Sequence, residues 1–388
     1  MKTDYKIKNL IHNFISIVSL FGINKILVLS SLIIIIIFLE VLSIGLIVPI
    51  ISILENKDFL NNLFNNINFI PEMTHVEQII SILLFLCFVF LVKFLFLIFA
   101  NYKQFKYSME LQSYMSNKLI KKYLTMPYES HFQLKTSEIL RNVKEETGSF
   151  VHGVLIPVIN ITTEVLVITG ITILLVSQIG LASFSIIILF ILFCWFYIKF
   201  SKKRIQKLGN DRFVIDEKII NTSNEAFSGI REIKVNRVES LFQNYFQSLF
   251  NRNAENTRKF LTFQQVPRLL IETLLVFFLS FLMFVLVFQE MIFSKIIVIL
   301  GLFCISAIRL IPSTNKIMLA QQNIRFYFVS INNLAKELFY KKSNKKKKTI
   351  EFSKDIKLSN IKFSYVKKNL KVLNNLKLTI NKGDRIAI

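Results

Sequence analysis

The sequence predicts a membrane all-α fold in which six transmembrane helices continue into long cytoplasmic extensions, followed by a short β segment. The first observation is composition: 53% of the 388 residues are hydrophobic, and the mean hydropathy is +0.51. That composition is too apolar for an ordinary soluble protein of this length. The second is that the apolar residues gather in long blocks, and the third is that basic residues dominate the segments between some of these blocks.

The N-terminal segment, residues 1–24, is amphipathic. Residues 7–22 repeat apolar side chains at helical spacing, among them Phe14, Ile17 and Val18. This pattern is typical of an interfacial helix lying on the membrane surface, and a helix packed inside the protein is the alternative.

The transmembrane domain is expected over residues 25–338. A membrane-spanning helix needs about 20 mostly apolar residues. The six stretches that meet this requirement are residues 26–53, 79–100, 151–176, 181–200, 269–288 and 293–311.

The charges between these stretches predict the orientation. The segments after the second and fourth stretches are rich in Lys and Arg, whereas the segment after the first is mainly acidic. Cytoplasmic loops of membrane proteins carry an excess of Lys and Arg. We therefore expect both basic segments and both termini on the cytoplasmic side of a bacterial inner membrane. The formal net charge of +23 is therefore attributed to topology, since no groove-reading motif of a nucleic-acid binder is present.

The two basic connections, each about 50 to 65 residues long, contain few Gly or Pro and keep helical apolar spacing. They predict membrane helices that continue as paired rods into the cytoplasm, where short turns join them. Residues 128–140 mark one turn, and residues 221–232, with Gly229, mark the other.

The last part of the chain changes character. A Lys-rich linker over 339–349 precedes a β-rich segment, residues 350–388, with strands expected at 356–365, at 372–380 and from Arg385 onward. A strand needs hydrogen-bonding neighbours, so we expect further chain after Ile388.

Two sets of motifs carry a resemblance to a known family. The C-terminal runs IKFSY and VLNNLKLTINKGDRIAI resemble the opening of an ABC nucleotide-binding domain, just before its Walker A loop. PYESHFQLKTSEILRNV, QQVPRLLIETL and IRLIPSTNKI resemble the PglK-type lipid-linked oligosaccharide flippases over essentially the whole chain. The resemblance implies the ABC type I exporter fold, a homodimer, and flipping of an undecaprenyl-pyrophosphate glycan for protein glycosylation or polysaccharide export.

The resemblance also implies ATP with Mg²⁺ in the intact protein. It places Tyr365 as the aromatic side chain that stacks on adenine, the alternative being a Tyr on a sheet face. Because Walker A, signature and Walker B residues are absent from the sequence, we expect no ATP hydrolysis from these residues alone. The alternative functions are an ABC exporter of another lipid, a peptide or a drug, and a non-transporting fragment of an interrupted gene.

Four cations in or beside the expected spans are candidate substrate-binding residues: Lys93, Arg268, Arg309 and Lys316. A cation within a span costs free energy and usually faces a bundle interior or an aqueous cavity. Arg309 and Lys316 are seven residues apart and therefore share one helical face. Pyrophosphate is a dense anion that Arg grips with two donors and Lys with a point charge. The resemblance matches all four positions to cavity-lining basic residues, with Lys at 93 and 316 where the family has Arg.

Each of three cations also has a plainer interpretation. For Lys93, the alternative is that its side chain snorkels to the membrane interface. For Arg268, it is an ion pair with Glu272, one helical turn further on. For Lys316, it is a position already in the cytoplasm. Two carboxylates in the expected spans, Glu40 and Glu164, are either helix partners or part of an outward polar pathway. The histidines and cysteines lack metal-ligand spacing, so no metal site is expected.

Overall fold

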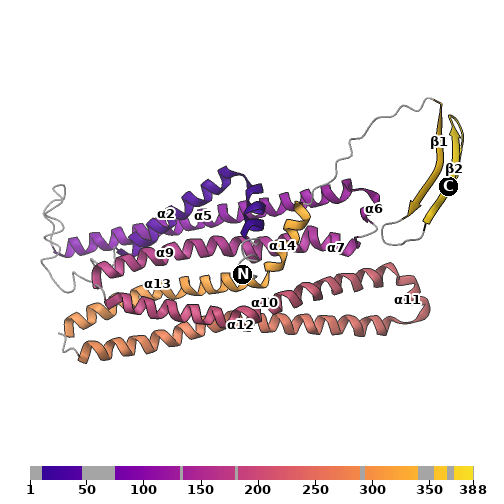
Figure 1. Cartoon of the computed structure of the whole chain (residues 1–388). Coiled ribbons are helices and arrows are strands. Elements are labelled where there is room, and N and C mark those ends of the chain that lie inside the picture. The colour runs from indigo at the N-terminus through magenta and orange to yellow at the C-terminus, as the bar shows by residue number, and fades with distance from the viewer. Residues whose placement is uncertain are drawn as a thin grey trace, which may run out of the picture. The chain divides into compact units, whose positions relative to one another are not determined.

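The computed structural model describes residues 11–45, 75–131, 134–179, 182–288, 293–339, 354–364 and 371–387. The chain divides into two compact units, Met1–Tyr340 and Lys341–Ile388. The first unit is helical, and the second contains a β-hairpin (Figure 1).

The first described element of the helical unit is a helix over residues 11–18. The elements that follow are η1 (Ser19–Phe21), α2 (Ile23–Gly45), α5 (His75–Thr125), α6 (Tyr128–His131), α7 (Thr136–Leu140), η2 (Arg141–Glu146), α8 (Thr147–Phe150), η3 (Val151–Leu155), α9 (Ile156–Ile179), α10 (Ala182–Ser228), α11 (Ile230–Asn236), α12 (Glu239–Phe288), α13 (Phe293–Phe326) and α14 (Phe328–Leu338). Both η2 and η3 are π-helical turns within the run that leads into α9.

Within the described ranges, four helical segments are long and apolar enough to cross a membrane: Ile23–Ser43, Ile80–Thr125, Thr136–Ile173 and Glu239–Phe281. They fall on the expected spans one, two, three and five. The remaining two expected spans, the fourth and the sixth, lie on α10 and α13. The described residues therefore form a mostly helical protein whose long apolar helices indicate membrane insertion.

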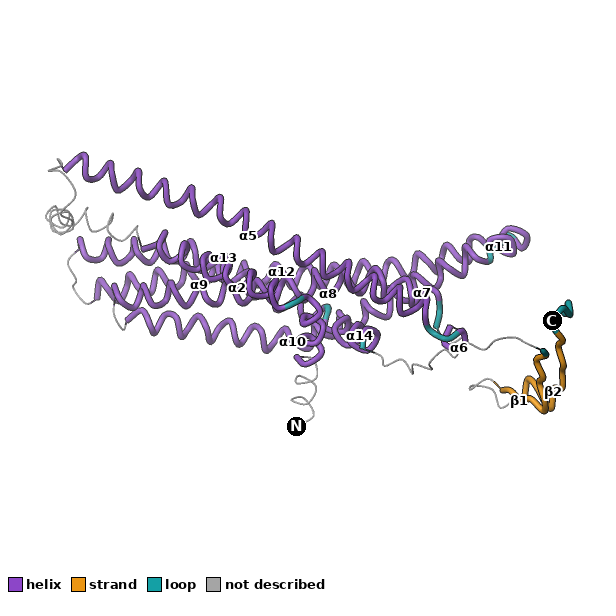
Figure 2. The backbone as a smooth tube through the Cα atoms, turned by 90° about the horizontal axis from the view of Figure 1, so that it is seen from above, coloured by secondary structure: helices purple, strands orange, loops and turns teal. Residues whose placement is uncertain are grey.

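Three helices are far longer than a bilayer is thick: α5 has 51 residues, α10 has 47 and α12 has 50. At 1.5 Å per residue, α5 extends about 75 Å, against about 40–45 Å for a bilayer with its headgroups. The helices run unbroken from apolar ends into polar ends, which confirms the prediction of continuous helical rods. Helices α10 and α12 run alongside each other (Figure 1), whereas Figure 2 shows α5 diverging from the bundle toward its N-terminal end.

Short elements join these rods at their polar ends. Helices α6 and α7 connect α5 to the run that leads into α9, and α11 connects α10 to α12 (Figure 1). The second turn was predicted too early, because residues 221–228 remain in α10 and the left-handed residue is Arg237, with φ 55°. Gly229 only interrupts the helix, since its N–H still bonds to the carbonyl of Glu225.

The core of the helical unit lies where the N-terminal helix, α5, α8 and α14 meet. Ile17 is fully buried there, and the ring of Phe14 lies 5.9 Å from that of Phe150. Part of the apolar face of the N-terminal helix is thus covered by protein. The packed alternative describes Phe14 and Ile17, and the location of this helix on the membrane surface stays a prediction.

The second unit is an antiparallel pair of strands, β1 (Asp355–Ser364) and β2 (Lys371–Asn381), with Asp355 opposite Asn381 and Leu358 opposite Leu378. Both strands were expected at nearly these bounds. The third expected strand is wrong over residues 385–387, which form no strand. A strand exists only through a hydrogen-bonded neighbour, and in the described chain only β1 and β2 pair.

Candidate functional site

Lys93 is held inside the helical bundle by α2. Its Nζ lies 2.9 Å from Oε2 of Glu40 and 2.9 Å from Oγ of Ser43, one turn further along α2. The Lys93 and Glu40 side chains are only 14% and 4% exposed, and the Phe90 ring lies 5.1 Å from the ammonium. Lys93 therefore does not snorkel to an interface.

Lys316 on α13 pairs with Glu164 on α9, two helices that pack along each other. Its Nζ lies 2.7 Å from Oε1 of Glu164. The two partners differ in exposure, because the Lys316 side chain is 55% exposed and the Glu164 side chain 6%. Glu164 and Glu40 are thus helix partners, the first of the two alternatives for these carboxylates.

Arg268 pairs with Glu272 on the same helix, α12, with Nε 2.9 Å from Oε1. Both side chains are largely exposed, at 63% and 47%. The local-pair interpretation is confirmed for this residue. Such an exposed i,i+4 pair contributes only about 0.3–0.5 kcal/mol, so a stronger anion would displace it readily.

The other two predicted site residues have side chains outside the described part of the structure. Arg309 belongs to the backbone of α13, but its side chain is not described. Tyr365 lies between β1 and β2, outside the described residues.

The structure adds buried polar atoms that sequence reasoning missed, directly after Pro312 in α13. Ser313 Oγ, Thr314 Oγ1 and Asn315 Oδ1 are buried and have no hydrogen-bond partner among the described residues. A proline within a helix removes one backbone hydrogen bond and disturbs the preceding turn. The signal in the sequence was the polar run Ser-Thr-Asn after a proline at the end of an apolar stretch.

A second missed cluster surrounds the break between α13 and α14. The Arg212 guanidinium lies 4.4 Å from the Tyr327 ring centroid and 5.5 Å from that of Phe326. Its Nη1 donates a 3.2 Å hydrogen bond to Ser149, and Asp216 lies 3.5 Å away. Burial raises the pKa of the Asp216 carboxyl, against the opposing effect of Arg212.

Helix α14 is fastened to α5 by a further polar network. Lys122 Nζ lies 2.6 Å from Oε2 of Glu337, and the Tyr123 hydroxyl donates to the same oxygen over 3.0 Å. Asn142 donates to Tyr123, and its own oxygen accepts from Asn333. These residues fix the junction of α5, η2 and α14.

The described residues contain no group of three or more His, Cys, Asp or Glu side chains that could hold a metal ion. Searching the chain against protein-family models gave no match. The fold and the site define a class only: a mostly helical protein whose long apolar helices indicate membrane insertion, and in which three of the four candidate cations have a described carboxylate partner.

Proposed function

We propose that this chain is the membrane-spanning part of an ATP-driven ABC transporter that flips an undecaprenyl-pyrophosphate-linked oligosaccharide across the bacterial inner membrane. The observation that carries the proposal is that α5, α10 and α12 extend well beyond the thickness of a bilayer and end in short polar connections. The family resemblance of the motifs points to the same class of transporter.

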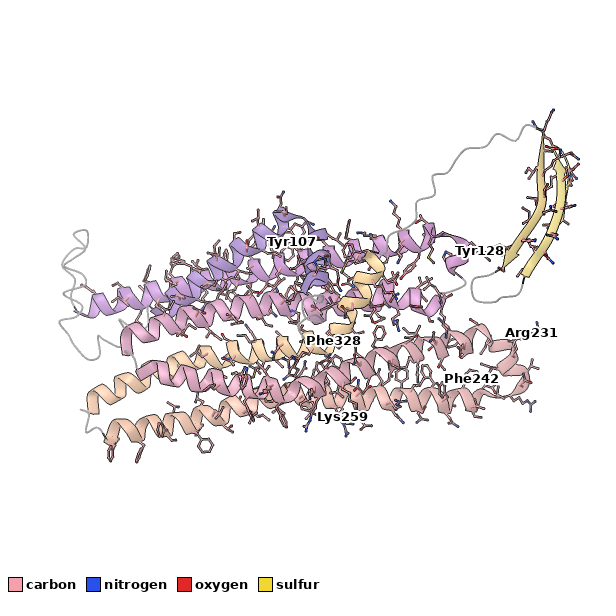
Figure 3. All side chains as sticks on the ribbon, in the orientation of Figure 1. Tyr107, Tyr128, Arg231, Phe242, Lys259 and Phe328 are labelled. Carbon is pink, nitrogen blue, oxygen red and sulfur yellow. The ribbon has the colours of Figure 1, made fainter. Side chains whose placement is uncertain are left out.

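The long helices support a mechanism of alternating access. In the proposal, six spans cross the membrane with both termini in the cytoplasm, and ATP with Mg²⁺ drives closure of two nucleotide-binding domains in a homodimer. The polar ends of the hairpins, where Figure 3 shows Tyr128 on α6 and Arg231 on α11, would receive that motion. Tyr365 would stack on the adenine ring.

The amphiphilic substrate is supported by two kinds of surface. Large apolar side chains on α5, such as Phe88 and Phe94, are exposed and suited to contact with lipid. Lys316 and Arg268 present exposed cations close to the apolar segments, which suits a pyrophosphate group attached to a polyprenyl chain. Arg309 shares the helical face of Lys316 and is the cation that the proposal places at the centre of the site.

Display of glycan on cells tests this proposal. The protein is expressed from its complete gene in cells deleted for it, and surface glycan is quantified for the wild type, for Arg309→Ala and for Lys259→Ala, an exposed cation on α12. We expect Arg309→Ala to reduce display at least about tenfold, since a lost bidentate contact to an anion is worth a few kcal/mol. Lys259→Ala should keep display. Unchanged display in Arg309→Ala at normal protein levels would favour an exporter of another lipid, a peptide or a drug.

A further inference from the structure

We propose that Glu164 is a built-in counter-ion that competes with the anionic substrate for Lys316 and so limits how tightly that substrate is held. This inference rests on the proposed function, because it concerns the pyrophosphate group of the same substrate. It assigns to a carboxylate a role in an otherwise basic site.

The geometry separates Lys316 from Lys93, although each pairs with a carboxylate of a neighbouring helix. Lys93 donates to two oxygen acceptors and its side chain is only 14% exposed, so its ammonium is much less accessible to a ligand than that of Lys316. Lys316 is 55% exposed, and among the described residues its one hydrogen-bond partner is Glu164. An anion can therefore approach Lys316 from the open side, while Lys93 acts as a clamp between α2 and α5.

The asymmetry of burial gives Glu164 its effect. Its carboxylate is 6% exposed, so moving the Lys316 ammonium away weakens the electrostatic stabilisation of a buried charge. An incoming pyrophosphate therefore either shares Lys316 with Glu164 or draws the cation away at that cost. Sharing brings two negative charges close together, and drawing the cation away weakens the Glu164 pair, so both routes weaken binding and favour return of Lys316 to Glu164 when the anion leaves. A transporter must release what it binds, so this competition favours turnover.

Binding of farnesyl pyrophosphate to the purified chain in lipid nanodiscs tests the inference. We compare the wild type with Glu164→Gln, with the double variant Glu164→Gln/Lys316→Gln, and with Glu255→Gln. The last makes the same charge change in the exposed Glu255–Lys259 pair of α12. Glu164→Gln should lower the Kd at least about fivefold, because it removes the competing charge next to the cation. The double variant, which also removes the Lys316 cation, should lose that gain, and Glu255→Gln should bind like the wild type.

The outcomes separate failure of the inference from failure of the proposed function. Binding by the wild type that Glu164→Gln leaves unchanged or weakens would overturn the inference and leave the flippase proposal standing. No binding by either protein would overturn both. A gain that Glu255→Gln reproduces would also overturn the inference, because it would reflect overall charge. Should Glu164→Gln fail to fold, Glu164→Asp, which draws the carboxylate back by one methylene, should still lower the Kd by a smaller factor.

Discussion

Gly209 packs directly against the backbone carbonyl of Phe326, so closely that a Cβ on Gly209 would lie 2.1 Å from the carbonyl oxygen. Gly153 makes a similar approach to Tyr327, where a Cβ would lie 2.3 Å from the ring. Helix α10 and the turn η3 thus both pack closely against the break between α13 and α14, each through a glycine. The break is held between α10 on one side and η3 on the other.

Replacing Gly209 with Ala should therefore destabilise the protein. The added methyl group meets backbone, which cannot rotate away, so we expect a loss of about 1–3 kcal/mol and a lower Tm in detergent. The matched control is Gly148→Ala in α8, where the nearest atom to a new Cβ is Gln112 Nε2 at 3.5 Å. That change should be neutral or stabilising, since Ala favours a helix over Gly. Equal Tm values for the two variants would contradict the close packing at Gly209.

Replacing only Glu40 of the Lys93–Glu40 pair should destabilise the protein more than replacing both residues with apolar ones. Glu40→Gln leaves the Lys93 ammonium almost buried with a weaker partner, so the free energy of unfolding should fall by about 3–5 kcal/mol. The double replacement Lys93→Met/Glu40→Leu leaves no unpaired charge and should recover much of this loss. Thermal unfolding in one detergent compares the three proteins, and additive losses in the double variant would argue against a direct pair.

The N-terminal helix offers a test of its packing against the protein. The Ile17 side chain is fully buried, whereas that of Ile15, two residues away, is 58% exposed to solvent. Ile17→Ala should cost about 2–5 kcal/mol because it leaves a cavity, and Ile15→Ala should change the Tm little. If both variants instead keep the wild-type Tm but lose membrane association, the helix would act at the membrane surface.

Stability at acidic pH should depend on Asp216. Burial raises the pKa of this carboxyl above its ordinary value of about 4, so the folded state favours the protonated form. Its contribution to stability is complete below the ordinary pKa and is lost as the pH rises through the raised value. The Tm of the wild type minus that of Asp216→Asn should therefore increase as the pH falls from about 7 toward about 4. A difference that moves in the opposite direction would mean that the pairing with Arg212 dominates over burial.

The helices could be predicted well from the sequence, but most of the contacts between their side chains could not. Long apolar blocks that continue into amphipathic rods are local signals, and α5 and α12 follow them closely. The pairing of Lys316 with Glu164 joins positions 152 residues apart, and only the packing of α13 on α9 brings them together. Arg268 and Glu272 were predictable as a pair because both lie on one helix.

Backbone details were the other part that the sequence left open. The turn near Gly229 was predicted too early, because a glycine within a helix costs only about 1 kcal/mol and other contacts can maintain the helix across it. The π-helical turns η2 and η3 have no simple sequence pattern, and both contain buried residues, Arg141 and Asn142 in η2 and Val151 and Val154 in η3. The third strand was predicted from its residue types alone, although a strand also requires a neighbour.

Translocation in proteoliposomes tests the proposed function most directly. The protein expressed from its complete gene is reconstituted with a fluorescent undecaprenyl-pyrophosphate oligosaccharide, and the fraction accessible to a glycan-cleaving enzyme outside is followed with and without ATP and Mg²⁺. We expect ATP-dependent movement of this lipid, reduced at least about tenfold in Arg309→Ala. Vesicles that hydrolyse ATP without moving the lipid, or move it equally well in Arg309→Ala, would contradict it.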